Sequence, residues 1–175
     1  MQHSPPGPRG SAERELAAAL EAALRPSVLL DRFPKAQVDI FCLCLDSGCG
    51  GGPDAPVMGG ELAAATMAAS LALAHAGVEM RDLGSACSVA CASGSAGEEA
   101  VLLLDPLASE LPRAAGSLFV AAMTSCDAQT LQLTREAWTD PELLLEAREL
   151  ALDACRSLDA GLREQLRQSL SQVSS

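Results

Sequence analysis

Aromatic side chains are almost missing from this sequence, which has no tyrosine, one tryptophan and three phenylalanines among its 175 residues. Hydrophobic residues still make up 49% of the chain, and alanine and leucine supply most of them. A core must therefore be built from small and branched side chains, which favours packed helices. A chain of this length suits one domain of ordinary size, with enough apolar residues to bury a core.

Positive charge is also scarce, because Lys35 is the one lysine and the net charge is −11. Affinity for a phosphate backbone comes largely from clustered lysine and arginine, so this composition argues against a free-standing nucleic-acid binder. The nearest approach to a basic cluster is Arg25, Arg32 and Lys35. Any contact with RNA would need partners that supply the positive charge.

The patterns of an exported or membrane protein are missing too. No charged n-region followed by an apolar h-region opens the sequence, and seven cysteines are an odd number for a secreted disulfide framework. The longest apolar stretch, Leu62–Val78, contains Thr66, Ser70 and His75 and is interrupted by Gly77, so a membrane span is not expected. These absences predict reduced thiols and a soluble protein of the cytosol or nucleus.

The amino-terminal half is predicted to contain a helix and a buried strand. Met1–Gly10 is rich in proline and glycine and is predicted to be a disordered stub, followed by one domain over residues 11–175. Helical spacing of apolar residues predicts a first helix that has Ser11 as its N-cap and ends near Pro26. Lys35–Leu45 first alternates and then becomes wholly apolar, which predicts a central strand covered on both faces.

The rest of the chain predicts an α+β fold in which helices cover a mixed sheet. A further loop is expected over Asp46–Met58, and a turn over Ser93–Glu99. The other expected elements are a helix at Gly59–Ala76 that Gly77 ends, strands at Leu83–Ala92 and Ala100–Asp105, a hairpin of Ser117–Met123 and Gln129–Leu133, and a long amphipathic helix from Asp140 to about Ser169.

The cysteines do not predict a metal site. Cys42 and Cys44 fall on one side of the predicted central strand, with Cys49 in the loop that follows. Cys87 and Cys91 are likewise on one side of a predicted strand, and no histidine lies at a zinc-like spacing from either pair. Free cysteine commonly behaves as a small buried hydrophobe, so we expect these pairs to lie in the core and expect neither metal nor cofactor.

The remaining candidate sites have simpler interpretations. The loop Gly48–Gly52 lacks the GK[ST] ending of a P-loop and the GxGxxG fingerprint, so it predicts no phosphate cradle. His75 has no carboxylate or nucleophile at a telling spacing, and His3 belongs to the stub. Asp105 follows an apolar strand, where catalytic carboxylates do occur, but a helix N-cap is the better interpretation.

Four segments together resemble the RNase PH family, and within it the RNase PH-type ring subunits of the eukaryotic RNA exosome. The most specific is the third, where GG is followed by an alanine-rich helix and the phrase LALAHAGVEMRDL. The resemblance covers nearly everything after Ser11 and is weakest in the last helix. The segments are ERELAAALEAALRP (Glu13–Pro26), FPKAQVDIFCLCLDSG (Phe33–Gly48), GGELAAATMAASLALAHAGVEMRDLGSACSVA (Gly59–Ala90) and LLLDPLASELPRAAGSLFVAAM (Leu103–Met123).

The resemblance implies which residues an active member needs. Active members cleave RNA from its 3′ end with phosphate as the attacking group, using arginines to hold phosphate and aspartates for acid/base or metal work. At the matching positions this chain has Ala12 and Leu62 in place of arginines and Ser117 in place of an aspartate. Glu61 adds a carboxylate beside Leu62, and only Asp105 matches a family aspartate. No catalytic residue is therefore assigned.

The resemblance implies a fold of the RNase PH type, also described as ribosomal protein S5 domain 2-like, that is incomplete on its N-terminal side. Family members place several strands ahead of the first helix, where this chain has the stub. A missing part of the sheet would expose an edge and apolar surface, which predicts instability or obligate assembly. The expected function is that of a non-catalytic structural subunit of the exosome ring, supporting 3′-to-5′ RNA processing and degradation.

The partners implied by the resemblance are other RNase PH-like subunits in a hetero-oligomeric ring and capping RNA-binding subunits, with RNA bound weakly or only inside the assembled ring. The implied location is the nucleus, nucleolus and cytoplasm. An active phosphate-dependent exoribonuclease remains an alternative. An unrelated helical adaptor is a third possibility, and lack of a sheet between the Phe33 and Gly59 regions would indicate it.

Overall fold

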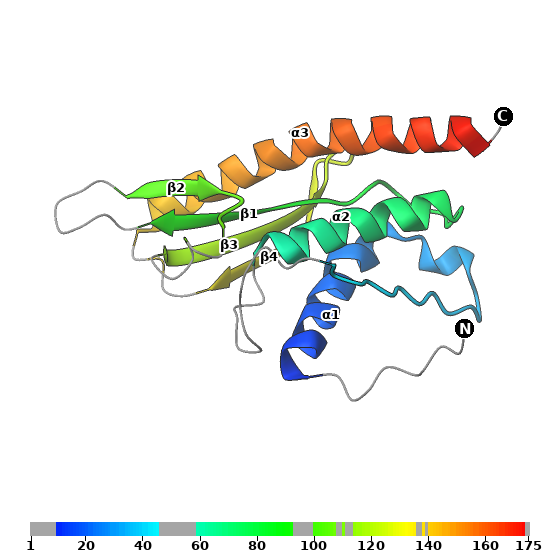
Figure 1. Ribbon diagram of the computed structural model, residues 1–175, viewed down its shortest axis with the longest axis horizontal. Helices are drawn as coiled ribbons and strands as arrows, with labels where there is room; N and C mark the ends of the chain where they lie inside the picture. The colour runs from blue at the N-terminus through cyan, green and yellow to red at the C-terminus, as the bar shows by residue number, and fades with distance from the viewer. Residues whose placement is uncertain are drawn as a thin grey trace.

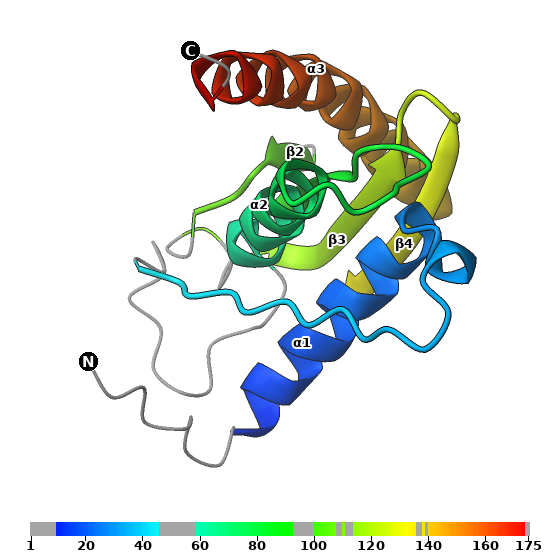
Figure 2. The ribbon, with the colours of Figure 1, turned by 90° about the vertical axis from the view of Figure 1, so that its right-hand side faces the viewer.

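The computed structural model describes residues 10–45, 59–92, 100–107, 110, 114–135, 138 and 140–173. Within these ranges, one sheet has helices on both of its faces (Figures 1 and 2). Residues 1–9 of the predicted stub Met1–Gly10, and the predictions for Asp46–Met58, Gly48–Gly52, Cys49 and Ser93–Glu99, lie outside the described residues. None of the described helices is both long and apolar enough to cross a bilayer.

The first helix, α1, spans Ser11–Leu24 and runs into a short 3₁₀ turn, Arg25–Ser27, so the predicted end near Pro26 is confirmed. The predicted N-cap is wrong, because Gly10 occupies that position and Ser11 is the first helical residue. The side chain of Glu13 folds back to accept a hydrogen bond from the Gly10 amide at 3.2 Å. This contact satisfies the free amide at the helix start without a serine cap.

The second helix, α2, spans Gly60–His75 and confirms the predicted alanine-rich helix. Gly77 ends it with a φ of 76°, a left-handed conformation that glycine adopts without a steric penalty. The amides of Gly77 and Val78 donate to the carbonyls of Ala74 and Leu73, each at 3.1 Å. This pair of bonds is a Schellman motif, as the position of the glycine in the sequence predicts.

The sheet has four strands in the order β2-β1-β3-β4. The predicted strands at Leu83–Ala92 and Ala100–Asp105 and the predicted hairpin are confirmed, with β3 and β4 somewhat longer than expected. Every neighbouring pair is antiparallel, whereas the sequence predicted a mixed sheet. The strands are β1 (Ser85–Ala92), β2 (Val101–Leu104), β3 (Ala114–Met123) and β4 (Ala128–Arg135).

The two faces of the sheet carry separate hydrophobic clusters. Phe119 and Ala121 of β3 face α1 and α2, where they pack with Leu62 and Leu24 among others. Their neighbours in sequence, Leu118 and Val120, point to the other face. There they pack against the last helix, α3, which spans Pro141–Val173 and confirms the predicted amphipathic helix. Both faces of β3 are therefore buried.

Small residues let α3 approach the sheet closely. Ala147, Ala151 and Cys155 recur every four residues along α3 and are fully buried. At this spacing they form one stripe of the helix, and their short side chains leave room for the backbone of β1 and β3. Beyond Arg163, no residue of α3 with a described side chain is buried. The helix therefore extends past the sheet, as Figure 1 shows.

The largest difference between prediction and structure concerns residues 37–45, called the outer segment below. Sequence patterning predicted a central strand over Lys35–Leu45, but no strand is formed there. The outer segment runs as an elongated stretch on the side of α1 and α2 that faces away from the sheet (Figure 2). Phe41 is 80% exposed and Leu43 is 83% exposed. The prediction fails because no described strand pairs with this segment.

Candidate functional site

Most of the positions singled out by the family resemblance lie around the amino-terminal end of α2. Gly60 is the first residue of α2, and Asp105 comes directly after β2 with a φ of 49°. The Asp105 amide donates to the carbonyl of Ser88 at 2.8 Å, which ties the residue to the neighbouring strand. A Cβ on Gly60 would lie 2.7 Å from the Asp105 Oδ1 atom. Glycine at position 60 thus allows the carboxylate to lie against the helix.

Asp105 is not the helix N-cap that its sequence context favoured, since no helix begins there among the described residues. Its carboxylate instead lies beside the amino-terminal end of a helix distant in sequence, where negative charge is favourable. Glu61, half-buried in the first turn of α2, lines the same groove as Asp105. Leu16 also lines this groove, so the first turns of α1 reach it.

Leu62, which occupies a family arginine position, faces away from this groove. Its side chain is fully buried in the cluster between the sheet and the helices, together with Leu20 and Phe119. A guanidinium at this position would be buried among the apolar side chains of this cluster, which costs on the order of several kcal/mol. The surroundings of Leu62 therefore suit an aliphatic side chain and not a phosphate ligand.

Ser117, at the position of a family aspartate, lies near the start of the buried part of β3. It pairs with Ala90 of β1 and is 8% exposed. Its carbonyl accepts a hydrogen bond from the Trp138 indole at 3.4 Å. By the alternation of the strand, its side chain shares the α1/α2 face with Phe119 and, one strand over, Ser88. The Ser88 hydroxyl is buried without a hydrogen-bond partner.

Ala12, the remaining position, is the second residue of α1. Three of the four positions therefore lie near one another, around the start of α2 and the facing strands. What they offer is one exposed carboxylate, a buried leucine and a buried serine. None of these three supplies a positive charge.

The cysteines fall into two groups. Cys42 and Cys44 are exposed on the outer segment, which corrects the expectation that they lie in a core. Cys87 and Cys91 are buried, as expected, and Cys155 of α3 packs beside Cys87. Burial raises the pKa of the Cys87 thiol to about 11, and the Asp105 carboxylate adds to the rise. Burial raises the pKa of Cys155 to about 12.

Thiols with such raised pKa values stay protonated near neutral pH, so they are poor nucleophiles and poor metal ligands. Across the described ranges, no group of three or more histidine, cysteine, aspartate or glutamate side chains could hold a metal ion. His75 is the exposed last residue of α2. No chemistry is assigned to it.

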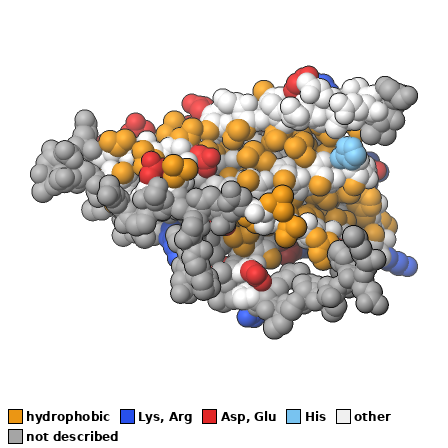
Figure 3. Space-filling model, in the orientation of Figure 1, with side chains coloured by type: hydrophobic (Ala, Val, Ile, Leu, Met, Phe, Trp, Pro, Cys, Tyr) orange, Lys and Arg blue, Asp and Glu red, His pale blue; other side chains and the backbone are white. Residues whose placement is uncertain are grey.

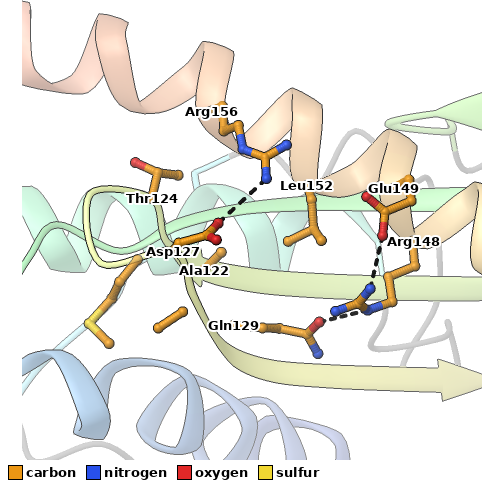
Figure 4. Close-up of a pocket in the computed structure, with 10 residues that line it drawn as sticks. Ala122, Thr124, Asp127, Gln129, Arg148, Glu149, Leu152 and Arg156 are labelled. Carbon is orange, nitrogen blue, oxygen red and sulfur yellow. Dashed lines mark hydrogen bonds and ion pairs between the residues drawn. The ribbon is translucent and has the colours of Figure 1, made fainter.

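A second hollow, of about 230 Å³, lies between α3 and the turn that joins β3 to β4 (Figure 4). Two arginines of α3 border it, and each is already paired. Arg156 contacts Asp153 at 2.6 Å and Asp127 at 3.5 Å. Arg148 contacts Glu149 and Gln129, each at 3.0 Å. Because carboxylates neutralise both guanidinium groups, this hollow is a poor receptor for phosphate.

A polar cluster that the sequence did not predict joins α3 to the end of the sheet. Arg163 pairs with Asp82, just ahead of β1, and with Asp159 one turn earlier in α3, the latter at 2.8 Å. The Ser125 amide donates to the second Asp82 oxygen at 2.8 Å. Burial alone would raise the pKa of Asp82, but Arg163 and the Ser125 amide outweigh it and hold this pKa below its usual value.

This cluster has a structural role, since it attaches α3 at the last point where that helix is buried. The i, i+4 spacing of Asp159 and Arg163 is visible in the sequence as a possible helical ion pair. The long-range partner Asp82 is not, because only the fold brings it within reach. One Asp159 oxygen is buried without a partner.

Known proteins match this chain in sequence. Residues 2–79 match the family model described as "3′ exoribonuclease family, domain 1". The human protein named "Exosome complex component MTR3" is 41% identical over 165 residues, which are 94% of this chain and 55% of the relative. The Arabidopsis thaliana protein named "Exosome complex component RRP41-like" is 36% identical over 169 residues, which are 96% of this chain and 59% of the relative.

Solved structures show the same fold. The crystal structure of rice (Oryza sativa) Rrp46 superimposes with a TM-score of 0.65 at 19% identity, covering 92% of this chain and 68% of that one. The Archaeoglobus fulgidus exosome with RNA bound to its active site gives a TM-score of 0.57 at 16% identity, covering 93% and 64%. The chain spans a little over half the length of the two relatives named above. The chain is therefore similar in sequence to the RNase PH family and to exosome complex components, and it has an RNase PH-like fold.

Proposed function

We propose that this chain is a non-catalytic structural subunit of the RNA exosome ring, supporting 3′-to-5′ RNA processing and degradation. The observation that carries the proposal is the full burial of Leu62 at a position where active relatives are expected to place a phosphate-binding arginine. The name of the human relative, an exosome complex component, supports the assignment to that assembly.

The electrostatics of the groove support a loss of catalysis. Phosphorolysis requires cations that hold inorganic phosphate and the RNA backbone while charge develops in the transition state. The groove at the start of α2 is bordered by the carboxylates of Glu61 and Asp105, with no arginine or lysine in its described lining. These negative charges repel phosphate. The buried side chain of Leu62 supplies no positive charge to offset the repulsion.

The surface supports assembly with other proteins. Figure 3 shows hydrophobic side chains in a broad band over the face that carries β2, β1 and α2. Val101, Leu104 and Leu107 are 55%, 47% and 63% exposed. An apolar surface of this kind marks a protein interface more often than a free surface. We propose that RNase PH-like ring subunits and capping RNA-binding subunits are the partners, and that RNA is met only inside the ring.

The proposed location follows from the proposed assembly and is the nucleus, nucleolus and cytoplasm. No strand is described between Phe33 and Leu45, which was the sign expected of an unrelated helical adaptor. The four-stranded sheet and the RNase PH-like fold nevertheless argue against that adaptor. The alternative that deserves a test is an active phosphate-dependent exoribonuclease, because one structural neighbour holds RNA in its active site.

Two measurements test the proposal together. A tagged chain expressed in cells is expected to co-purify with exosome ring subunits, and the purified chain is expected not to shorten a 5′-labelled RNA in inorganic phosphate. Phosphate-dependent shortening would support the exoribonuclease instead. The matched control replaces Asp105 with asparagine, since any shortening that depends on the chain's own site would fall in this variant. A chain that stays a well-folded monomer without exosome partners would contradict the structural role.

A further inference from the structure

Three cationic residues meet at the end of the molecule where α1 and α2 finish. The stretch of residues 25–35 follows α1, and the segment after α2 lies beside it (Figure 1). The Arg81 amide donates to the Ser27 carbonyl at 2.7 Å, which brings Arg81 to the stretch that holds Arg32 and Lys35. We call Arg32, Lys35 and Arg81 the basic patch. The sequence placed two of them in a cluster, and only the fold adds the third.

The side chains of Arg32 and Arg81 lie on one side of this contact. Met80 forms an isolated antiparallel bridge with Val28, and Glu79 and Arg81 flank it. Alternate residues of an extended segment point the same way, so Glu79 and Arg81 share a side. The Nε atom of Arg32 lies 3.4 Å from a carboxylate oxygen of Glu79. Both guanidinium groups are therefore directed to the side that Glu79 occupies.

Lys35, the one lysine of the chain, has a backbone conformation that lysine rarely adopts. Its φ is 65°, and the amide of Ala36 donates to the carbonyl of Phe33 at 3.1 Å. With Pro34 before it, Lys35 occupies the third position of a type II turn, where a positive φ favours glycine. The other described non-glycine residues with a positive φ are aspartates, which tolerate it better. A residue kept in a strained conformation points to a role for its side chain.

The basic patch contains cations that no described carboxylate neutralises. Lys35 and Arg81 are exposed, and neither forms an ion pair with a described residue. Arg32 pairs with Glu79, but these side chains are 66% and 55% exposed, and exposed pairs contribute little. Most other described arginines are already neutralised. Those paired with carboxylates are Arg25, Arg148, Arg156, Arg163 and Arg167.

The local charge is opposite to that of the whole chain. The basic patch has three cations, and the same stretches carry two carboxylates, Asp31 and Glu79, whereas the chain has a net charge of −11. The next carboxylate, Asp82, is buried and already paired with Arg163. Leu30 is 44% exposed and adds apolar surface beside the patch. Arginine next to apolar side chains is typical of protein interfaces, so this composition suits contact with a negatively charged protein.

We propose that the basic patch is a docking site for a short acidic segment of a partner protein, in which several aspartates or glutamates are closely spaced. Arginine and lysine bind carboxylates through charge-assisted hydrogen bonds, and arginine does so in a bidentate manner. An incoming carboxylate can displace Glu79 from Arg32, because the exposed pair is weak. Lys35 and Arg81 need no exchange of partner. The inference rests on the basic patch and not on the proposed ring role.

An RNA backbone suits the basic patch less well. Affinity for RNA grows with the number of phosphates that are neutralised, and three cations neutralise few. A long polyanion would also be repelled by the net charge of −11 beyond the patch. A short acidic segment brings only the charges that the patch can pair.

The first experiment measures the binding of a fluorescein-labelled peptide of alternating aspartate and serine to the purified chain by fluorescence anisotropy. Binding is expected at low salt and should weaken as salt screens the charges. The same peptide with asparagine in place of aspartate should not bind. Lys35→Gln and Arg81→Gln should each weaken binding about threefold, and the double variant about tenfold. Arg167→Gln makes the same charge change on α3 and should bind like the parent chain.

A second pair of variants should have the opposite effect. Glu79→Gln frees Arg32 from its carboxylate and should tighten peptide binding about twofold to threefold. Glu164→Gln makes the same charge change on α3, where Glu164 pairs with Arg167, and should leave binding unchanged. Equal tightening in both variants would show that net charge, and not the basic patch, attracts the peptide. That result overturns the proposal.

A third variant tests whether the strain at position 35 is kept for binding. Lys35→Gly removes the charge and gives the turn the residue that its φ favours. It should weaken peptide binding like Lys35→Gln, yet raise the midpoint of thermal unfolding followed by circular dichroism. The circular dichroism spectrum also shows whether each variant is folded. A lower midpoint in Lys35→Gly would give Lys35 a structural role and overturn its part in the proposal.

Two further outcomes decide the occupant. If labelled oligouridine binds while the acidic peptide does not, and Arg81→Gln weakens that binding, RNA is the occupant and the choice of an acidic segment is wrong. If neither probe binds, or if Lys35→Gln and Arg81→Gln bind the peptide as the parent chain does, the basic patch is not a docking site. Co-purification with exosome subunits tests the ring role separately, so failure of one proposal leaves the other standing.

Discussion

Two regions of this chain are similarly apolar in sequence and have opposite surroundings. Strand β3 reads SLFVAAM over Ser117–Met123 and the outer segment reads VDIFCLCL over Val38–Leu45. Each has one phenylalanine, yet Phe119 is fully buried and Phe41 is 80% exposed. The difference lies in neighbours, because β3 has a strand on each edge and helices on both faces. Hydrophobic composition indicates that a segment should be covered, and the available partners decide whether it is.

The largest expected effect compares these two phenylalanines. Phe119→Ala should lower the free energy of unfolding by about 3–5 kcal/mol, since it removes a buried ring and leaves a cavity. Phe41→Ala should change it by about 0.5 kcal/mol or less in the isolated chain, as expected for an exposed site. Urea denaturation followed by circular dichroism measures both. A large loss of stability in Phe41→Ala would show that the outer segment is already packed in solution.

A smaller effect is expected where α3 leaves the sheet. Arg163→Ala should cost about 1–3 kcal/mol, because it leaves the Asp82 and Asp159 carboxylates together without their partner, in a partly exposed site. Arg167→Ala is the control, since its ion pair with Glu164 is exposed and should contribute under about 1 kcal/mol. Thermal unfolding of both variants provides the comparison, and equal losses would contradict the anchoring role of Asp82.

The same cluster predicts that the stability of the folded state depends on pH. The folded state holds the pKa of Asp82 below its usual value, so ionised Asp82 stabilises the fold above the unfolded pKa. This contribution should be lost as the pH falls through the lowered folded pKa. Denaturation midpoints measured between neutral and strongly acidic pH should therefore fall less in Asp82→Asn than in the parent chain. An identical pH profile in both would contradict the contribution from Asp82.

The last comparison, which includes the smallest expected effect, concerns two glycines. A Cβ on Gly116 would lie 3.0 Å from atoms of the Trp138 indole, whereas a Cβ on Gly161 in α3 would meet nothing within 4 Å. Gly116→Ala should cost about 1–3 kcal/mol through crowding. Gly161→Ala should raise stability by about 0.5–1 kcal/mol, because alanine is the better helix former. Urea denaturation tests this pair: relative to the parent chain, the midpoint should fall in Gly116→Ala and rise in Gly161→Ala.

Much of the fold could be predicted because local patterns and tertiary structure agree. Periodic apolar residues located α2, α3 and all four strands, and Gly77 marked a helix end that its backbone conformation confirms. The outer segment could not be predicted in the same way. Its pattern predicted a strand covered on both faces, which the structure contradicts, because periodicity contains no information on whether a pairing strand is present.

The candidate site was predictable only in part. The resemblance identified Leu62, Ser117 and Asp105 as positions to inspect, and the fold places them around the start of α2. The direction of the Leu62 side chain, into the core and away from the groove, was not visible in the sequence. Neither was the contact between Asp105 and α2, since the two are separated by about 45 residues and meet through close approach at Gly60.

The sequence by itself determined the helices, the four strands of the sheet, the resemblance to the RNase PH family and the lack of clustered positive charge, because these depend on residue types and their spacing along the chain. Tertiary structure alone decided which apolar segment is buried, which carboxylates share Arg163, and which of the family positions face a groove. These depend on contacts between residues far apart in sequence.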